Sequence, residues 1–210
     1  MAWNHSTHYF PWVLRAVEAR LQGRRAAAAI DVGSGDGEIA ARLTSLAEEV
    51  VGLDADAGQT DAARERHAER AGLRFETGDV LGTRLAEEPF DIVTCVACLH
   101  HLDLAAGLTR LKRLTAPGGV LVIVGLARDA GAVDRLRTLV AVPVSSLMRR
   151  LRGWHDHGAP VREPEEDSAA VRRAVAEVLP GARFRRRLYW RYSVEWQAPA
   201  TQSLELKRLR

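Results

Sequence analysis

Carboxylates and glycines gather in residues 29–40, where an apolar run ends in Asp31 and a glycine-rich loop follows. The loop has glycine at three alternate positions: Gly33, Gly35 and Gly37. Glycine lets a backbone turn sharply and approach a ligand without a Cβ in the way, and the helix expected next presents free N–H groups at its start. These residues predict a strand, a loop and a helix that bind a nucleotide-like ligand.

The acids of this loop distinguish between ligands. In a dinucleotide site the loop receives a pyrophosphate, and Asp31 and Asp36 would repel its two charges. The spacing also departs from the dinucleotide pattern G-x-G-x-x-G, because Glu38 stands where the third glycine belongs. A cationic ligand therefore suits the loop better than a dinucleotide.

Further acids follow two other predicted strands. Residues 50–53 form an apolar run that ends in Asp54, and a carboxylate at such a strand end can accept two hydrogen bonds from a ribose diol. The strand predicted from Leu73 to Thr77 is followed by Asp79. Nicotinamide enzymes also place an acid where Asp54 stands, but they need none at Asp79.

Together these segments resemble the class I S-adenosylmethionine (SAM) dependent methyltransferases, whose ligand carries a sulfonium and an ammonium. The loop resembles motif I, and residues 98–103, which follow the strand predicted at 90–97, resemble motif IV. Residues 116–119 (Ala-Pro-Gly-Gly) break the preceding helix and start a strand from Val120 to Leu126, as the family's fifth strand usually begins. The resemblance is close over 30–126 and looser over 183–196.

The resemblance implies an α/β fold, a Rossmann-like seven-stranded methyltransferase sheet with helices on both faces and the last strand antiparallel. We expect a helix from Ser168 to Leu179 and closing strands from Phe184 to Leu188 and from Tyr192 to Trp196. Composition agrees with a single domain over 1–210, because 210 residues with 47% hydrophobic content can bury one substantial core.

The implied cofactor is SAM, which leaves as S-adenosylhomocysteine (SAH). Asp54 would hold the ribose, and Asp79 looks like the family position that accepts a hydrogen bond from the adenine amino group. The residues expected to contact SAM are Asp31, Gly33, Ser34, Gly35, Asp54, Ala55, Asp79, Val80, Cys95, Val96 and Tyr9.

Residues 1–22 resemble the N-terminal cap that folds over SAM in small-molecule methyltransferases. A helical pattern with Val13, Leu14, Val17 and Leu21 on one face follows the aromatic leader, in which Phe10 and Trp12 are expected to fix the helix to the sheet. His5 and His8 are candidate acceptor contacts, although they and Tyr9 could equally be structural.

Residues 127–167 form a second candidate substrate segment. In this fold that connection lies over the carboxyl ends of the strands, so we expect it to act as a lid, with Trp154 and His155 as the leading acceptor contacts. Binding of a metal by His155 and His157 would require a strand there, so no metal site is expected.

Methyl transfer from a sulfonium is an in-line displacement that mainly requires positioning. A base is needed only if the acceptor starts protonated. For a hydroxyl acceptor the candidates are His100 and His101, because histidine titrates near neutrality and the end of the fourth strand faces the methyl group. His100 is favoured slightly, and one of the pair is expected to be held by backbone hydrogen bonds.

Charge and cysteine content exclude several functions. The formal charge of +3 comes from 30 basic and 27 acidic residues that are interspersed, so nucleic acid is not an expected partner. No run is long and apolar enough for a membrane span, and no secretory leader is seen. The two cysteines are expected to be buried thiols, and the protein to be a cytoplasmic monomer or homodimer.

The leading function is therefore methyl transfer from SAM to a small-molecule acceptor, a hydroxyl of a secondary metabolite. Nitrogen or carbon acceptors remain alternatives. So does a non-catalytic SAM-fold partner subunit, which the intact loop and acids disfavour. An NAD-dependent oxidoreductase is disfavoured by Glu38 and Asp79.

Overall fold

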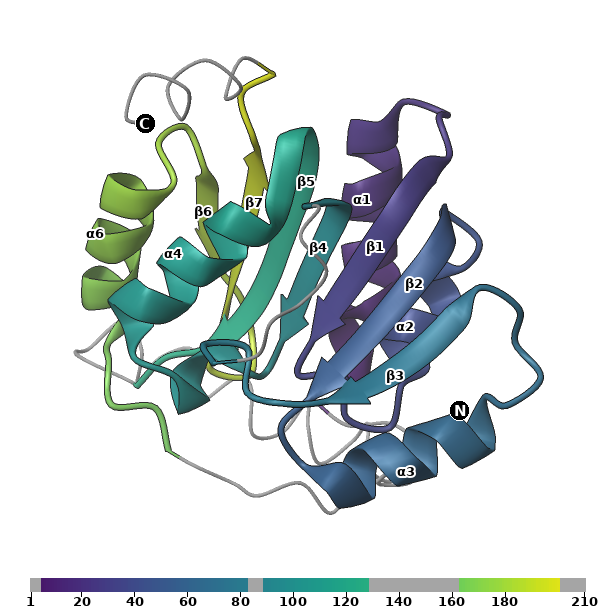
Figure 1. Cartoon of the computed structure of the whole chain (residues 1–210). Helices are drawn as coiled ribbons and strands as arrows, with labels where there is room; N and C mark the ends of the chain where they lie inside the picture. The colour runs from purple at the N-terminus through teal and green to yellow at the C-terminus, as the bar shows by residue number, and fades with distance from the viewer. Residues whose placement is uncertain (1–4, 83–88, 129–162, 201–210) are drawn as a thin grey trace, which may run out of the picture.

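A seven-stranded sheet forms the centre of the computed structural model, which describes residues 5–82, 89–128 and 163–200 (Figure 1). In spatial order the strands are β3 (Leu73–Thr77), β2 (Ala47–Asp54), β1 (Ala26–Val32), β4 (Phe90–Val96), β5 (Thr115–Leu126), β7 (Arg191–Gln197) and β6 (Arg183–Arg186). The strands from β3 to β5 are parallel, whereas β7 is antiparallel to both β5 and β6. The predicted α/β fold with an antiparallel last strand is confirmed.

Helices cover both faces of the sheet. They are η1 (Thr7–Tyr9), α1 (Phe10–Leu21), α2 (Glu38–Leu43), α3 (Ala57–Arg66), η2 (Leu99–His101), α4 (Leu104–Leu114) and α6 (Ser168–Val178). In Figure 1, α4 and α6 lie side by side on one face, and α1 and α2 lie behind the sheet. The layers therefore follow the sequence-based expectation.

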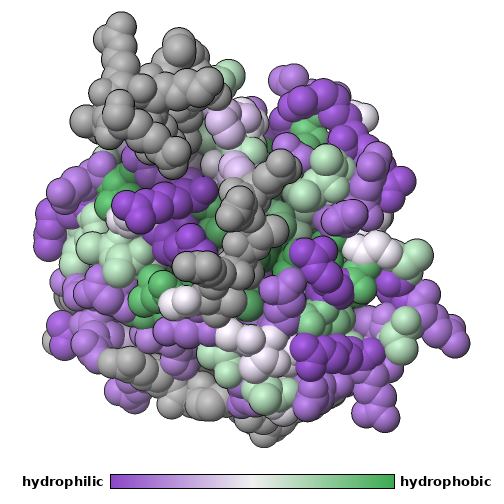
Figure 2. All heavy atoms as spheres, in the orientation of Figure 1, coloured by the Kyte–Doolittle hydropathy of each residue, from purple (hydrophilic) through white to green (hydrophobic). Residues whose placement is uncertain are grey.

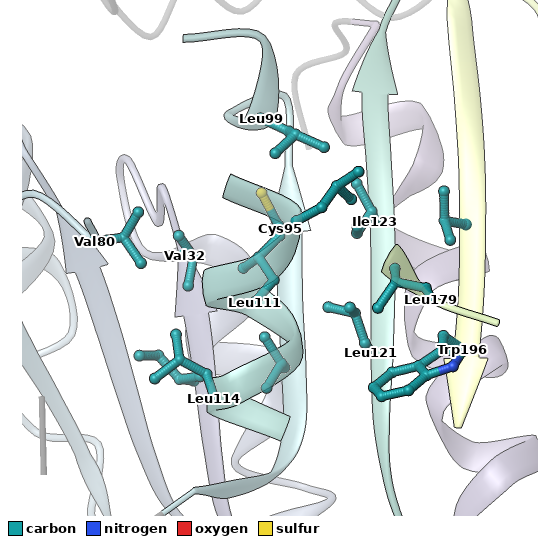
Figure 3. Close-up of a cluster of buried hydrophobic side chains, with 14 of the residues drawn as sticks. Val32, Val80, Cys95, Leu99, Leu111, Leu114, Leu121, Ile123, Leu179 and Trp196 are labelled. Carbon is teal, nitrogen blue, oxygen red and sulfur yellow. The ribbon is translucent and has the colours of Figure 1, made fainter. Parts of the chain in front are cut away.

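The core between the sheet and the helices α4 and α6 is made of large aliphatic side chains. Leu111 of α4 lies near Leu121 and Ile123 of β5, and all three are fully buried (Figure 3). Trp196 of β7 extends the cluster, and its indole Nε1 donates a hydrogen bond of 3.0 Å to the carbonyl of Pro180. Removal of this apolar surface from water is the main force that holds these layers together.

The opposite core is built on α1. Val13, Val17 and Leu21 recur every fourth residue and are buried against the sheet, as predicted, while Leu14 is only partly buried. Proline in the first turn of the helix costs no hydrogen bond, which explains why the helix can begin at Phe10 with Pro11 next.

The start of β5 differs from the prediction. The strand begins at Thr115 rather than Val120, and its pairing with β4 shifts from Phe90–Thr115 to Ile92–Val120. Residues 117–119 therefore lie inside the strand as an irregularity. A Cβ on Gly119 would be 2.8 Å from the carbonyl oxygen of Ala116, which explains a glycine at this point.

The neighbours β1 and β4 mark the place where the strand order reverses, and both end at the same edge of the sheet. Open parallel sheets bind ligands at such a point, beyond the carboxyl ends of the strands. The visible outer face is mainly hydrophilic, with hydrophobic side chains in smaller patches (Figure 2). No helix in the described ranges is long and apolar enough to cross a membrane.

Candidate functional site

A cavity of about 340 Å³ opens where β1 to β4 end, within the usual size range of ligand pockets of about 300–1,000 Å³. Five carboxylates line it: Asp31, Asp36, Asp54, Asp56 and Asp79. Among the described residues no lysine or arginine lines the cavity. Asp36 forms an ion pair of 2.8 Å with Arg66 of α3, which does not line the cavity. The cavity therefore favours a cationic ligand.

Asp31, at the end of β1, is the most buried of these acids. Its Oδ1 accepts a hydrogen bond of 2.7 Å from the hydroxyl of Thr94 on β4. Burial raises the pKa of Asp31 to about 7; the hydrogen bond from Thr94 acts in the opposite direction, and the charge of Asp54 raises the pKa further. Asp31 can thus exist in either protonation state near neutral pH.

Asp54, at the end of β2, is fixed by backbone donors. Its Oδ2 accepts from the N–H of Gly35 at 2.8 Å, and its Oδ1 accepts from the N–H of Asp56 at 2.9 Å. Asp56 in turn caps α3 by accepting from Gly58 and Gln59. The carboxylate of Asp54 is held in one orientation at the cavity wall.

Asp79 lies on the next strand connection, beyond β3. Its Oδ1 accepts from the N–H of Leu81 at 2.9 Å, and the preceding Gly78 donates to the carbonyl of Asp54 at 2.8 Å. The three acids predicted at successive strand ends therefore line one cavity.

The glycine loop serves internal packing as well as ligand access. Gly33 and Gly37 have φ of 72° and 79°, which L side chains rarely adopt. A Cβ on Gly33 would lie 2.3 Å from Cβ of Cys98, and one on Gly37 would lie 2.5 Å from the ring of Phe75. The positive φ values agree with the expected sharp turn, and at Gly33 and Gly37 protein side chains occupy the space that a Cβ would take.

Ser34 offers a second sign of a ligand in this loop. Its hydroxyl is buried, lines the cavity and has no hydrogen-bond partner within the described part of the chain. A buried polar group without a partner is costly, so a polar ligand group fits here. In chemical type, the acids suit the ammonium and hydroxyl groups of SAM, and the Ser34 hydroxyl suits its carboxylate.

Most of the predicted cofactor residues line the cavity, and two do not. Those that do are Asp31, Gly33, Ser34, Gly35, Asp54, Ala55, Asp79, Val80 and Val96. Cys95 is fully buried in the α4 and α6 core, and its pKa is raised by a hydrogen bond to Cys98 and by burial. Cys98 lines the cavity instead, because Ala97 has a left-handed φ of 55° that turns the chain after β4.

Tyr9 is the other predicted residue that does not line the cavity. Its hydroxyl donates to the carbonyl of Leu188 at 2.8 Å, and its ring is buried. His5 stacks on Tyr189 with ring centroids 4.9 Å apart, and His8 meets Tyr9 edge-on at 5.0 Å. These three predicted contacts pack against the β6–β7 hairpin.

The N-terminal segment reaches the cavity through Ser6 and Phe10, which sequence reasoning did not assign to the site. They are four residues apart, which places them on the same face of a helix. This spacing was the only indication in the sequence that both could contact the cavity. Gln59 also lines the cavity and was missed, because it belongs to no motif.

The two candidate bases face different cavities. His101 lines the acidic cavity, whereas His100 lines a second one of about 300 Å³ with Asp103, Glu166 and Tyr192. Their ring centroids are 4.1 Å apart. The slight preference for His100 is therefore not supported by the geometry, because the turn of η2 sends the first histidine away from the acids.

Trp154, His155 and most of the predicted lid at 127–167 lie outside the described residues. Where that segment is described, Ala127 donates to the carbonyl of Trp190, and Arg128 forms an isolated bridge with Asp167. Within the described ranges, no group of three or more histidine, cysteine or acidic side chains is arranged to hold a metal ion.

The strand order and the acidic cavity at the reversal point define a class of protein, the Rossmann-like methyltransferases that use SAM. A family model described as a methyltransferase domain matches residues 30–123. An uncharacterised methyltransferase of Mycobacterium tuberculosis is 34% identical over 199 residues, which cover 94% of this chain and 98% of that protein. The chain belongs to the class I SAM-dependent methyltransferases, and it is an enzyme of that family.

More distant similarities name different acceptor atoms. A ubiquinone biosynthesis O-methyltransferase of Methylococcus capsulatus is 31% identical over 150 residues, covering 69% of this chain and 60% of that protein. The solved structure of the N-methyltransferase NodS of Bradyrhizobium japonicum with SAH has a TM-score of 0.62 at 15% identity, covering 92% of this chain and 87% of that one. The structural similarity shows the shared fold.

Proposed function

We propose that this enzyme transfers the methyl group of SAM to an oxygen of a small-molecule acceptor. The observation that carries the proposal is the cavity at the β1–β4 reversal point, lined by five carboxylates and, among the described residues, by no lysine or arginine. A sulfonium and an ammonium are stabilised by such a field, while a pyrophosphate is repelled.

Each strand end has a separate task in this proposal. Asp54, fixed by the N–H groups of Gly35 and Asp56, accepts from the ribose hydroxyls. Asp79 accepts from the adenine amino group. Asp31 and the hydroxyl of Ser34 bind the amino-acid end, where Ser34 gains the partner that it lacks.

His101 is the proposed base for a hydroxyl acceptor. Bound SAM supplies an electrophilic methyl group, and the residues of this chain hold the acceptor oxygen in line with it. His101 lines the same cavity as the acids, so it can take a proton from an acceptor there, which His100 in the neighbouring cavity cannot do directly.

Two further assignments belong to the same proposal. Residues 1–210 act as one domain, and the connection 127–167 covers the acceptor during reaction. The name of the Methylococcus capsulatus relative favours oxygen as the acceptor atom.

The experiment is a screen with SAM labelled on its methyl group, incubated with the enzyme and a metabolite extract. The expected result is one labelled small-molecule product whose methyl group is on oxygen. A labelled methyl group on nitrogen or carbon would contradict the assignment of oxygen as the acceptor atom. A reaction without added enzyme is the control, because product that still formed there would come from another enzyme in the extract.

A further inference from the structure

Arg191, the first residue of β7, carries a buried guanidinium beside the cofactor cavity. Arg191 is only 8% exposed, and its Nη2 donates a hydrogen bond of 3.0 Å to the hydroxyl of Ser6. Its Nε is buried without a hydrogen-bond partner in the described part of the chain. Because Ser6 lines the cavity, the guanidinium lies one hydrogen bond away from it.

No carboxylate in the described ranges forms an ion pair with Arg191. The nearby phenols of Tyr9 and Tyr192 are uncharged at neutral pH, because burial raises the pKa of both, so they do not balance its charge. Burial lowers the pKa of Arg191 to about 10, so the group is still charged at neutral pH. A buried charge without a counter-ion is strongly unfavourable, and an anion that binds beside it would remove that penalty.

Arg191 lies on the side of the sheet away from the acids. It pairs with Leu126 at the carboxyl end of β5, whereas Asp31, Asp54 and Asp79 follow β1, β2 and β3 on the other side of β4. The guanidinium does not itself line the acidic cavity and is joined to it through Ser6, so a ligand that extends from the acids past β4 would approach a positive charge.

The turn before Arg191 gives an independent sign of function. Tyr189 and Trp190 both have a left-handed φ of 57°, in a tight hairpin turn closed by a hydrogen bond of 3.3 Å from Arg191 N–H to the carbonyl of Leu188. Central positions of such turns favour glycine and asparagine, and aromatic residues there are strained. Residues with strained backbone conformations are enriched at active sites and ligand-binding sites.

We propose that Arg191 binds a carboxylate of the methyl acceptor and that Trp190, which is only partly buried, contacts the planar body of the same molecule. The inference rests on the proposed function and specifies its substrate class, an aromatic acid that carries the hydroxyl to be methylated. The guanidinium offers Nε and a second donor in the fork geometry that a carboxylate matches.

The test compares two probes that differ in one charge, 3,4-dihydroxybenzoate and 3,4-dihydroxybenzamide, each titrated calorimetrically into the enzyme saturated with SAH. The wild type is expected to bind the acid about tenfold or more tightly than the amide, the effect of a charged hydrogen bond. Arg191→Met should abolish this preference, Arg191→Lys should retain part of it, and the matched control Arg185→Met, on an exposed site of β6, should keep it.

Equal binding of acid and amide by the wild type would overturn the proposal, and so would no measurable binding of the acid at millimolar concentration. A preference that survives in Arg191→Met would also overturn it. Thermal unfolding adds a second readout. Because the charge has no carboxylate counter-ion in the described ranges, Arg191→Met should leave Tm unchanged or higher, whereas a lower Tm with the preference intact would make Arg191 a structural anchor of Ser6.

The SAH titration that precedes each probe separates this inference from the proposed function. Wild-type enzyme that fails to bind SAH would contradict the proposed function itself. Normal SAH binding with no preference for the acid would contradict only the role of Arg191.

Discussion

Gly35 and Asp54 are joined by a hydrogen bond of 2.8 Å from the backbone N–H of the loop after β1 to Oδ2 of the acid at the end of β2. This bond connects the two segments that a SAM molecule would bridge. Since a second backbone donor, from Asp56, fixes the other oxygen, the carboxylate does not have to be reoriented when a ligand binds. Preorganised groups of this kind lose little entropy on binding.

Replacement of Asp54 by alanine is expected to weaken SAM binding by about tenfold to over a hundredfold, because a charged hydrogen bond contributes about 1.5–3 kcal/mol. Asp54→Asn keeps one acceptor oxygen and should lose less. Calorimetric titration with SAM measures both, and Asp61→Ala, at an exposed acid paired with Arg64 on α3, serves as the control. Unchanged affinity in a folded Asp54→Ala protein would contradict the ribose assignment.

The raised pKa of Asp31, about 7, predicts how stability depends on pH. Between the ordinary carboxyl value and pH 7 the folded protein holds a proton that the unfolded chain releases. The free energy of unfolding should therefore fall as pH rises through this range, by up to about 1.4 kcal/mol per pH unit, and level off above pH 7. Urea unfolding of the ligand-free protein from pH 4.5 to 8, at about half-unit intervals, measures this slope. Asp31→Asn should remove that component, and an equal slope in both proteins would show that Asp31 is not its source.

Thr94→Val tests the partner of that carboxyl. The hydroxyl of Thr94 donates at 2.7 Å to Asp31 and lowers its pKa, so the nearly isosteric valine should raise the pKa further. In the proposed site, cationic SAM should bind best to ionised Asp31. Its affinity should consequently rise with pH in both proteins and reach its plateau at a higher pH in the variant. Calorimetry at several pH values detects this shift. If the SAM affinity of both proteins reaches its plateau at the same pH, the prediction is wrong.

Tyr9→Phe examines a residue that the sequence assigned to the cofactor and the structure does not place in the cavity. The loss of the bond from its hydroxyl to Leu188 leaves a carbonyl without its donor, and we expect a loss of about 1–3 kcal/mol in unfolding free energy with SAM affinity unchanged. Chemical denaturation and SAM titration of the same sample give both numbers. A large loss of SAM affinity with unaltered stability would return Tyr9 to the cofactor site.

The sequence could predict the acids of this site because each stands at the end of a strand that the hydrophobic pattern already identifies. Asp31 and Asp54 follow apolar runs, Asp79 follows the predicted strand Leu73–Thr77, and the parallel order brings the ends of these strands to one edge. The antiparallel last strand was predicted from the family resemblance instead. Local pattern and fold together were sufficient here.

The direction of individual side chains near the strand ends could not be predicted in the same way. Cys98 rather than Cys95 lines the cavity because Ala97 adopts a left-handed φ, a conformation that nothing in an alanine indicates. Tyr9 points away from the cavity because its hydroxyl donates to the carbonyl of Leu188. Leu188 is 179 residues away along the chain, so the local sequence around Tyr9 does not indicate this contact. The direction of these side chains depends on tertiary contacts, which cannot be inferred from residue spacing alone.

The positions of the two histidines of η2 in different cavities lead to a kinetic prediction. His101→Gln should lower kcat for a hydroxyl acceptor by about 10²–10⁴, the usual range for the loss of a general base, with SAM affinity preserved. His100→Gln, in the second cavity, is the matched control because the two rings lie 4.1 Å apart and the substitution is the same. Its effect should be within a few-fold of wild type.

The pH dependence of the rate provides an independent readout for His101. The wild-type kcat should rise through an apparent pKa in the range of a histidine, about 6.5 or shifted by its surroundings, and His101→Gln should lose this limb. Because Asp31 also titrates near neutrality, the profile is measured at saturating SAM, where binding no longer limits the rate. If His100→Gln loses activity and the pH limb while His101→Gln keeps both, the base lies in the second cavity. If neither variant changes the rate, positioning alone is sufficient, and the acceptor enters as an anion that needs no base.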